Sequence, residues 1–569
     1  MTKIIVSDIE SRNWIEFLCI GFYDGKLYKH FLSLQEYFDF IYSKKDVTSI
    51  YFHFGGGFDF LFLLKHAFEN DKLFTVTKMI PRGSKFLTIS IKYKNKTIKF
   101  LDSSCFLPFA LRTLAENFNV ETKKGTIDYD NITEVTDELL DYMKDDHLAL
   151  YQVIKKYSEN HIIKKVGLKM TIASQAYSVF KECYLTVKII PLKKHQEKFA
   201  RLAFQGGRTE IYKPLFLGDE NTELHEYDVN SLYPSVMATN DFPIAFDYST
   251  KTLDLEKLSI NHVKVYIPEN TYMPPLGIVE KETKKYIFPT GTFSGYWTNI
   301  ELKTALKYGA KIIKVYECHV YKNGGNIFEK YISEIYMLRK NSPKISADNI
   351  IYKLLMNSLF GRYALNTDRE KIVIDDGRTG IKPYLEIPME NGNFVRLATE
   401  KVELNSETFV PIAVFVTSYA RVHCYENFLY PLQKEVFYSD TDSFYLLNKL
   451  PSSNELGEVK HEKSVNQACF ILPKSYIAGN FVKLKGFDSK KAQNFTIDDF
   501  TSFLEGEMRI KQEVPKRIAR FKESLRRNKK ILSMLPKSEK VIRSIYDKRE
   551  IIKLENDLYD SFPLVLNTN

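Results

Sequence analysis

Acidic residues that could hold divalent cations stand in three clusters near the N-terminus. Asp8 and Glu10 lie two residues apart in an apolar stretch, Asp59 follows three glycines and a phenylalanine, and Asp146 stands four residues after Tyr142. Asp8 and Glu10 would share one face of a strand, and Tyr142 and Asp146 one face of a helix. Each cluster on its own is more often a group of ordinary surface acids with no function. Together, four converging carboxylates could hold two Mg²⁺ ions for phosphodiester hydrolysis.

A second acidic set stands further along the chain. Asp228 ends a predicted strand, and Asp440 and Asp442 lie in a predicted strand–turn–strand over 435–447. Two carboxylates two residues apart in an apolar strand repel each other in a low dielectric, so a neutralising cation is the economical explanation. This spacing indicates a second metal site.

A predicted helix between these acids carries a further candidate surface. Lys353, Asn357 and Phe360 fall close to one helical face. A cation, an amide and an aromatic ring suit a triphosphate and a base better than they suit a core. On its own, the same pattern also fits a plain amphipathic helix.

The elements that must position these residues alternate between strands and helices in the first 165 residues. There we expect strands over 3–9 and 50–54, an apolar helix over 58–68 and a hairpin over 86–101. Residues 161–200 are typical of basic helices, and the glycine pair that follows them indicates a domain joint. The rest of the chain is expected to contain β-rich stretches at 246–330 and 371–410, helices at 329–339, 350–359 and 411–430, and a mostly helical tail over 497–569 that is basic at 516–530.

Length and composition limit the class of protein. The chain has 569 residues, 44% hydrophobic and 27% charged, which excludes a small binding module and a mostly disordered chain. Its net charge of +10 fits a polyanionic partner. The six cysteines form no C-x-x-C pair, and no apolar run approaches the roughly 18 residues of a membrane span. We expect a soluble, cytoplasmic protein with no membrane partner.

Six motifs that follow one another in a fixed order indicate one protein family. Asp228-x-x-Ser-Leu-Tyr-Pro-Ser, Lys353-x-x-x-Asn-Ser-x-x-Gly and Tyr438-x-Asp-Thr-Asp-Ser resemble motifs A, B and C of family B DNA polymerases. The upstream Asp-x-Glu, Phe-Asp and Tyr-x-x-x-Asp clusters resemble the three motifs of the 3′→5′ exonuclease of that family. Compact length and two insertions make the chain similar to the protein-primed polymerases of bacteriophages and linear plasmids.

The resemblance implies a multidomain α/β and α+β fold, with an RNase H-like exonuclease and a right-hand polymerase of palm, fingers and thumb. We expect the exonuclease over 1–165, a linker and the first part of the palm over 166–245, and a first palm insertion, the terminal-protein region, over 246–330. The fingers would follow over 331–363, a second palm insertion over 364–410, the second part of the palm over 411–495 and the thumb over 496–569. If the second insertion closes a ring with the thumb and palm, processive strand displacement follows.

The resemblance also implies roles for the polymerase residues. Asp228, Asp442 and the carbonyl group of Val229 would hold two Mg²⁺ ions, for which Mn²⁺ could substitute, with Asp440 as a neighbouring acid. The incoming nucleotide would meet a set of side chains around them: Tyr233, Lys353, Asn357 and Phe360, with Arg339, Lys340 and Lys344 as weaker candidates. The Tyr233 ring would leave no room for a ribose 2′-hydroxyl, so the product would be DNA.

In the exonuclease, the implied metal ligands are Asp8, Glu10, Asp59 and Asp146, and Tyr142 would orient the attacking water. The implied DNA contacts are spread along the chain: Phe204, Gly206, Gly207, Ser103, Lys124, Thr441, Lys474 and Tyr476. The chain departs from the family where an asparagine that binds the frayed 3′ end is replaced by Phe54 or Gly55. Weaker or altered proofreading is therefore expected.

The resemblance implies template-primer DNA and deoxynucleoside triphosphates as substrates, a separate terminal protein as primer, and action as a monomer. One alternative is a nucleic-acid-primed family B replicase of a virus or mobile element. A reverse transcriptase would favour Tyr-x-Asp-Asp and would not carry this exonuclease. A non-catalytic DNA-binding relic would have little reason to keep these carboxylates.

Overall fold

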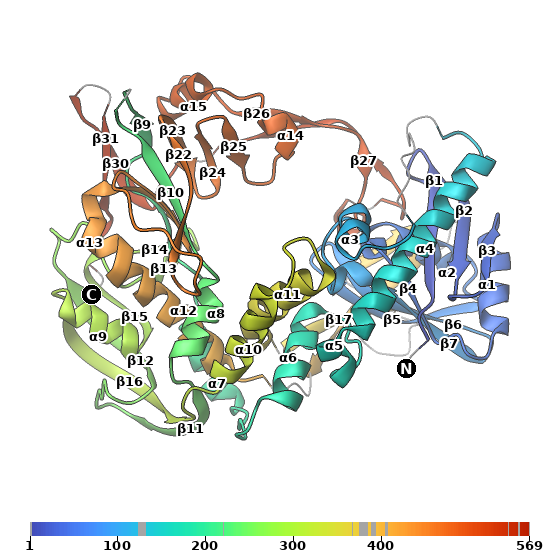
Figure 1. The fold of residues 1–569 in the computed structure, drawn as a ribbon, viewed down its shortest axis with the longest axis horizontal. Coiled ribbons are helices and arrows are strands. Elements are labelled where there is room, and N and C mark those ends of the chain that lie inside the picture. Colours follow the sequence, from blue (N-terminus) through green and yellow to red (C-terminus); the bar gives the residue numbers. More distant parts are fainter. Residues whose placement is uncertain are drawn as a thin grey trace.

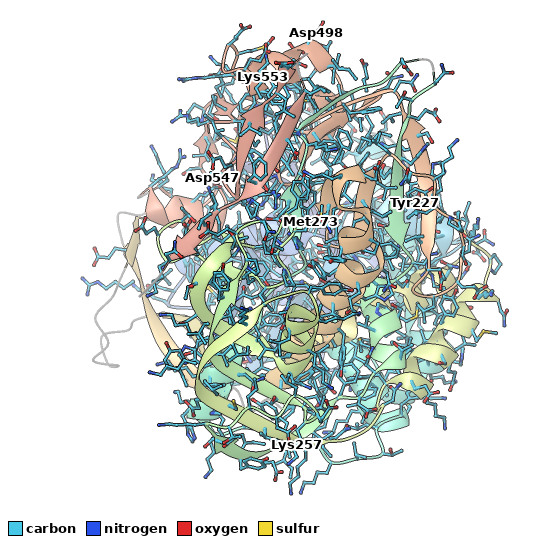
Figure 2. The ribbon with its side chains drawn as sticks, turned by 90° about the vertical axis from the view of Figure 1, so that its left-hand side faces the viewer. Tyr227, Lys257, Met273, Asp498, Asp547 and Lys553 are labelled. Carbon is cyan, nitrogen blue, oxygen red and sulfur yellow. The ribbon has the colours of Figure 1, made fainter. Side chains whose placement is uncertain are left out.

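The elements of the chain follow one another around a closed circuit (Figure 1). The computed structural model describes residues 3–122, 132–219, 221–366, 368–374, 385–388, 394–403, 408–527, 529–543, 545–555 and 558–567. The N-terminal part lies on one side of the circuit, the palm and first insertion lie on the other, and the thumb passes between them. Figure 2 views the palm side, with Tyr227 on a palm strand, Lys257 and Met273 in the first insertion, and Asp498 and Lys553 at the thumb end.

A ten-stranded sheet forms the centre of the N-terminal part. Its order is β18-β19-β17-β5-β6-β7-β4-β1-β2-β3, and β4 runs parallel to β1 and β7. The strands of the predicted exonuclease part are β1 (Val6–Arg12), β2 (Glu16–Tyr23), β3 (Tyr28–Phe31), β4 (Ser49–Phe52), β5 (Phe74–Arg82), β6 (Lys85–Tyr93) and β7 (Lys96–Asp102). The helices are α1 (Leu34–Ser43), α2 (Asp59–Glu69), α3 (Leu111–Asn117) and α4 (Asp137–Glu159).

The predicted elements of this part are confirmed. The β6–β7 hairpin turns at Lys94, whose φ of 54° lies in the left-handed region. Residues 59–64 of α2 are all buried, because this helix is apolar on every side and packs between the sheet and the loop before it. Helix α4 begins at an N-cap, Thr136, and lies against β1 and β2.

The palm is built on a five-stranded sheet with the order β22-β10-β21-β20-β8. Its strands are β8 (Thr209–Ile211), β10 (Leu224–Val229), β20 (Val436–Asp440), β21 (Ser443–Leu446) and β22 (Val459–Val465), which confirms the predicted strand–turn–strand as β20–β21. Helices α8 (Leu232–Thr239) and α12 (Val410–Cys424) pack on each other. A second sheet, β25-β24-β23-β9, consists of β9 (Leu215–Leu217), β23 (Gln467–Leu472), β24 (Ser475–Ala478) and β25 (Phe481–Leu484).

The fingers are helical. Helices α10 (Glu329–Lys340) and α11 (Ala347–Tyr363) pack on each other, and α11 also packs on α6 (Ile172–Cys183). The remaining helices of the predicted basic stretch are α5 (His161–Val166) and α7 (Lys194–Leu202). The stretch expected as a linker therefore supplies part of the core under the fingers.

The first insertion is a sheet with the order β11-β16-β12-β15-β32. Its elements are β11 (Pro243–Thr250), β12 (Ser259–Ile267), β13 (Ile278–Val279), β14 (Tyr286–Ile287), β15 (Thr290–Thr298), α9 (Asn299–Lys307) and β16 (Lys311–Asn323). The added edge strand, β32 (Val565–Asn567), comes from the end of the described chain and pairs in parallel with β15. A Cβ at Gly291 would stand 2.3 Å from the Leu566 carbonyl oxygen, so this pairing needs glycine.

The second insertion forms β17 (Asp368–Ile374), β18 (Leu385–Pro388) and β19 (Phe394–Glu403). Strand β17 pairs with β5, so these strands extend the exonuclease sheet. The buried Leu397 side chain lies in the exonuclease core together with Phe521, Ile531 and Leu532 of the thumb. The described part of the second insertion therefore shares a core with the thumb at the N-terminal sheet, and the predicted ring with the palm stays a prediction.

The prediction of a mostly helical tail is wrong. After α14 (Ser489–Ala492) and α15 (Ile497–Leu504), the described tail consists largely of strands: β26 (Lys511–Val514), β27 (Arg517–Ile518), β28 (Met534–Leu535), β29 (Ser538–Val541), β30 (Arg549–Lys553), β31 (Tyr559–Pro563) and β32, with one helical segment, α16 (Phe521–Arg526). Many Lys, Arg and Glu residues favour helix, but Pro515, Pro536 and Pro563 interrupt it, and the exposed and buried residues of β26 alternate.

Among the residues that the structure describes, no helix is both long enough and apolar enough to span a membrane.

Candidate active sites and family membership

The acids of the palm meet where two strands end. Asp228 lies at the end of β10 opposite Ser443 of β21, and the Val229 N–H donates a 2.8 Å hydrogen bond to the Asp442 carbonyl oxygen. Thr441 lies between the two acids of the turn with a φ of 69°, a left-handed conformation that makes the turn tight. The fold therefore joins residues more than 200 positions apart through one backbone bond.

Burial and mutual repulsion raise the free energy of the ionised form of these carboxylates. Burial, with Asp442 as the largest neighbouring charge, raises the pKa of Asp228 to about 7. Burial also raises the pKa of Asp442. A bound cation would remove this cost, so the donor set of Asp228, Asp442 and the Val229 carbonyl fits Mg²⁺.

Asp440 has other partners. Its Oδ1 accepts hydrogen bonds from the Thr209 hydroxyl at 3.1 Å and lies 3.2 Å from the Lys474 ammonium, whose side chain is half exposed. Tyr476 is buried among aromatic rings that include Phe470. Tyr476 thus packs the hairpin that presents Lys474, and its contact with DNA stays a prediction.

The predicted nucleotide surface forms on α11. Lys353 and Asn357 are exposed and lie on the same side as the half-buried Phe360. The Phe360 ring contacts the Tyr233 ring with centroids 4.5 Å apart. Burial and the negative charge of Asp442 raise the pKa of Tyr233 to about 12, so its hydroxyl stays protonated. The palm acids and the α11 surface thus meet at Tyr233.

Two of the three weaker candidates, Lys340 and Arg339, have structural partners. The Lys340 ammonium forms a 2.7 Å ion pair with Glu455 of a palm loop. Arg339 is half-buried in the last turn of α10, and its carbonyl oxygen accepts a hydrogen bond from Asn349. These contacts connect α10 with the palm and with α11.

The glycine pair lies next to the turn that carries Asp440 and Asp442. A Cβ at Gly207 would stand 2.5 Å from the Thr441 side chain, whereas a Cβ at Gly206 would meet nothing. The Thr441 N–H also donates to the Arg208 carbonyl oxygen at 2.8 Å. Glycine is therefore required at 207 for close approach. Gly206 is exposed and Phe204 is half-buried, and their contact with DNA stays a prediction.

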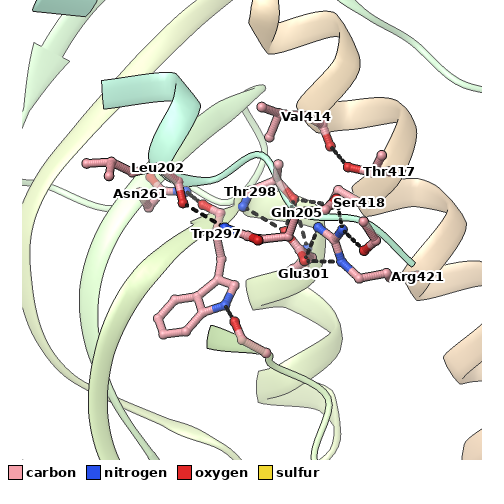
Figure 3. A network of polar contacts seen from close by, with 12 residues as sticks. Leu202, Gln205, Asn261, Trp297, Thr298, Glu301, Val414, Thr417, Ser418 and Arg421 are labelled. Carbon is pink, nitrogen blue, oxygen red and sulfur yellow. Dashed lines mark hydrogen bonds and ion pairs between the residues drawn. The ribbon is translucent and has the colours of Figure 1, made fainter. Parts of the chain in front are cut away.

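A buried ion pair that the sequence reasoning missed holds this loop (Figure 3). The Arg421 guanidinium of α12 donates to Glu301 Oε1 at 2.7 and 3.0 Å and to the carbonyl oxygens of Gln205 and Gly206 at 2.8 and 2.9 Å. Glu301 also completes the capping box of α9 with Thr298. The available signal was an arginine inside a predicted helix that is otherwise mostly apolar.

The acids of the exonuclease also lie together. Asp59 accepts a 3.0 Å hydrogen bond from the Ile9 N–H and has Asp8 as a hydrogen-bonding neighbour. Burial raises the pKa of Asp59 to about 7. Glu10 is buried on β1, and α4, which carries Tyr142 and Asp146, packs on this strand.

A cavity of about 220 Å³ opens between these elements and is lined by Ser7, Asp8, His53, Phe54, Ala110, Leu111, Asp146, His147 and Leu150. Asp8 and Asp146 thus face one space from a strand and a helix. Within the described residues, no group of three or more His, Cys, Asp or Glu side chains is arranged to coordinate a metal ion. Metal binding by the exonuclease acids stays a prediction.

Asp102 organises the loop before Asp59, a role that the sequence reasoning missed. This buried carboxylate accepts hydrogen bonds from the N–H groups of Phe54, Gly56 and Ser104 at 3.0, 3.2 and 2.9 Å. A Cβ at Gly56 would stand 2.0 Å from the Phe86 carbonyl oxygen. An aspartate at the end of a strand before two serines was the available signal.

Two further predicted DNA contacts, Ser103 and Lys124, lie in this part of the chain. Ser103 is fully buried, donates to the Phe52 carbonyl oxygen at 2.8 Å and bonds to His53 Nδ1 at 2.9 Å. Ser103 therefore orients His53, and its contact with DNA stays a prediction. Lys124 lies outside the described residues.

Comparison with known proteins places the chain in a family. The family model for DNA polymerase type B, organellar and viral, matches residues 41–136 and 131–444. The chain belongs to this family. It is 27% identical to a probable DNA polymerase of Neurospora intermedia over 84% of this chain and 58% of that protein, and 25% identical to one of Ascobolus immersus over 84% and 45%. It thus spans about half the length of these fungal relatives.

Phage members of the family are closer in length. The DNA polymerase of Bacillus phage phi29 is 28% identical over 84% of this chain and 85% of that protein. The phi29 DNA polymerase structure with primer-template DNA and incoming nucleotide matches with a TM-score of 0.74 and 21% identity, over 95% of this chain and 99% of that one. This likeness confirms the predicted fold of exonuclease, palm, fingers and thumb domains for this member of the type B family.

Proposed function

We propose that the chain is a DNA-directed DNA polymerase that extends a primer along a DNA template with deoxynucleoside triphosphates. The observation that supports this proposal most directly is the hydrogen bond from the Val229 N–H to the Asp442 carbonyl oxygen, which brings Asp228 and Asp442 together near the contact between Tyr233 and Phe360. Carboxylates that are costly as anions stand next to an aromatic surface, which suits a metal-bound triphosphate and its base. Membership of the type B family supports this proposal.

Each residue has a distinct task in the proposed reaction. Asp228, Asp442 and the Val229 carbonyl would hold two Mg²⁺ ions, which when bound activate the primer hydroxyl and neutralise the departing pyrophosphate. The exposed Lys353 and Asn357 would bind and orient the triphosphate. Lys474, paired with Asp440, would approach the primer terminus from the hairpin side.

Selection of deoxyribose would fall to Tyr233. Its ring is held against Phe360 and cannot retreat from a ribose 2′-hydroxyl without breaking that contact. Replacing Tyr233 with valine should raise ribonucleotide incorporation, measured as alkali-labile sites in the product. Unchanged sugar discrimination would remove this role from Tyr233.

The second proposed activity is 3′→5′ exonuclease. Asp8 and Asp146, which line the cavity, would hold cations together with Glu10 and Asp59, and Tyr142 would orient the attacking water. The raised pKa of Asp59 supports this proposal, because a cation would compensate the cost of its burial.

Priming by a separate terminal protein, action as a monomer, a cytoplasmic location and processive strand displacement belong to the same proposal. The first insertion would receive the primer protein. The core shared by exonuclease, second insertion and thumb supports processivity, because it closes the circuit of elements.

Primer extension on a singly primed circle with Mg²⁺ tests the proposal. Asp442→Ala should abolish synthesis and leave degradation of single-stranded DNA, and the matched Asp59→Ala should do the reverse. Products longer than one circle would support strand displacement. Full synthesis by Asp442→Ala would overturn the assignment of the polymerase site.

A further inference from the structure

The segment that follows β29, within the predicted thumb range and called the segment after the thumb, returns to the palm. Residues 545–553 pass from the thumb to the open edge of the palm sheet, and Figure 2 shows Asp547 nearer the first insertion and Lys553 near the thumb end. The hairpin β30–β31 follows at this edge. The segment thus lies beside the strands that carry the polymerase acids, although the sequence resemblance assigned it to the thumb.

The open edge belongs to β8, the last strand of the palm sheet. Side chains of the returning segment bond to its backbone. The Ile211 N–H donates to the Tyr546 hydroxyl at 3.1 Å, the Lys548 ammonium donates to the Thr209 carbonyl oxygen at 3.0 Å, and the Ser561 hydroxyl donates to the Tyr212 carbonyl oxygen at 2.7 Å. An edge that would otherwise be free is therefore fixed in place.

Thr209 connects this edge with the catalytic turn. It pairs with Asp440 in the β8–β20 ladder, and its hydroxyl donates to Asp440 Oδ1 at 3.1 Å. Lys548 is half-buried; burial lowers the pKa of its ammonium, and the negative charges of Glu210 and Asp440 oppose this effect. Lys548, Thr209 and Asp440 thus form a chain of contacts that ends at the turn carrying Asp442.

We propose that Lys548 is a positioning residue of the polymerisation centre, which acts through Thr209 on Asp440 and so sets the turn that presents Asp442. The inference rests on the proposed polymerase function. It assigns the segment after the thumb to the polymerisation centre. The Lys474 ammonium holds the same Asp440 oxygen from the other side, so the carboxylate lies between two independent supports.

Substitutions at both ends of this chain of contacts test the inference. Lys548→Met removes charge and donor, Lys548→Gln keeps a donor without charge, and Lys548→Arg keeps both. Thr209→Val removes the hydroxyl with little change of shape. The matched control is Lys553→Met, which removes a lysine of β30 that pairs with Glu505 on the surface.

The measurements are kcat for primer extension as a function of Mg²⁺, the exonuclease rate on single-stranded DNA and the thermal midpoint. Loss of a hydrogen bond from a charged group predicts that Lys548→Met lowers kcat or raises the half-saturating Mg²⁺ concentration about tenfold. The exonuclease rate and the midpoint should not change. Lys548→Arg should restore extension more fully than Lys548→Gln, and Thr209→Val combined with Lys548→Met should add little to either alone.

Extension by Lys548→Met with unaltered kcat and Mg²⁺ dependence would overturn the inference. A parallel fall of extension, exonuclease rate and midpoint would also overturn it, because that pattern belongs to a structural role. An unsubstituted protein that degrades DNA but extends no primer would instead overturn the proposed polymerase function.

Discussion

The thumb arm, defined as residues 517–535, should control how long the protein stays on DNA. Its Phe521 side chain is 3% exposed and contacts the Phe86 ring of the exonuclease with centroids 4.9 Å apart. Removing a buried phenylalanine side chain costs about 3–5 kcal/mol. If most of this burial exists only while the arm is docked, Phe521→Ala raises the undocked fraction about 10²–10³-fold.

The assay is primer extension on a long circular template with a competitor that captures released protein. We expect Phe521→Ala to shorten the products of one binding event at least roughly tenfold, while the rate per nucleotide is unchanged. Leu73→Ala, which removes an exposed leucine of the exonuclease, is the control. Products of full length from Phe521→Ala, with normal folding, would refute the idea that docking of the arm retains DNA.

Three further predictions concern stability. Arg421→Met should destabilise the palm by about 3–5 kcal/mol in urea denaturation, because it leaves Glu301 buried without its cation. Adding Glu301→Gln should restore part of the lost stability. A double variant whose destabilisation equals the sum of the two single variants would contradict this reasoning. Phe54→Asn should increase the free energy of unfolding by up to about 1 kcal/mol and so raise the melting temperature, because φ is +60° at this residue and asparagine tolerates the left-handed region. A lower melting temperature would show that packing of the Phe54 ring stabilises the fold more than its backbone strain destabilises it. Hydrogen bonds from Arg517 lower the pKa of Glu523 to about 2. The stabilisation of the arm by this pair is therefore present above the ordinary glutamate pKa and is lost as pH falls toward 2. Hydrogen exchange of the arm should show a loss below about 1 kcal/mol, and Glu523→Gln should abolish this pH dependence.

Local features of the fold were predictable where neighbouring residues determine the structure. The turn at Lys94, the strand–turn–strand around Thr441 and the apolar α2 all follow from patterns within about ten residues. The motifs also identified Asp228, Asp442 and Tyr233, which the fold brings together. The tail could not be predicted in this way, because its basic residues have helical propensity while prolines and pairing with distant strands determine its conformation.

The missed residues share a physical reason. Asp102 binds a loop about 50 residues earlier, Arg421 binds Glu301 120 positions away, and Lys548 binds Thr209 339 positions away. Each is an ordinary charged residue in its local sequence. Its role arises from burial beside a partner, and burial of this kind is set by tertiary structure.

The docking of the thumb arm has a consequence for how the chain folds during synthesis. Arg520 of the arm bonds to Ser84, 436 residues earlier, and the neighbouring Phe521 completes the apolar core of the exonuclease. At about 5–20 residues per second, a ribosome needs roughly 20–90 s to supply the second partner after the first. The N-terminal part therefore emerges with part of its core uncovered and waits for the synthesis of 436 further residues before that surface is protected from water and from other nascent chains.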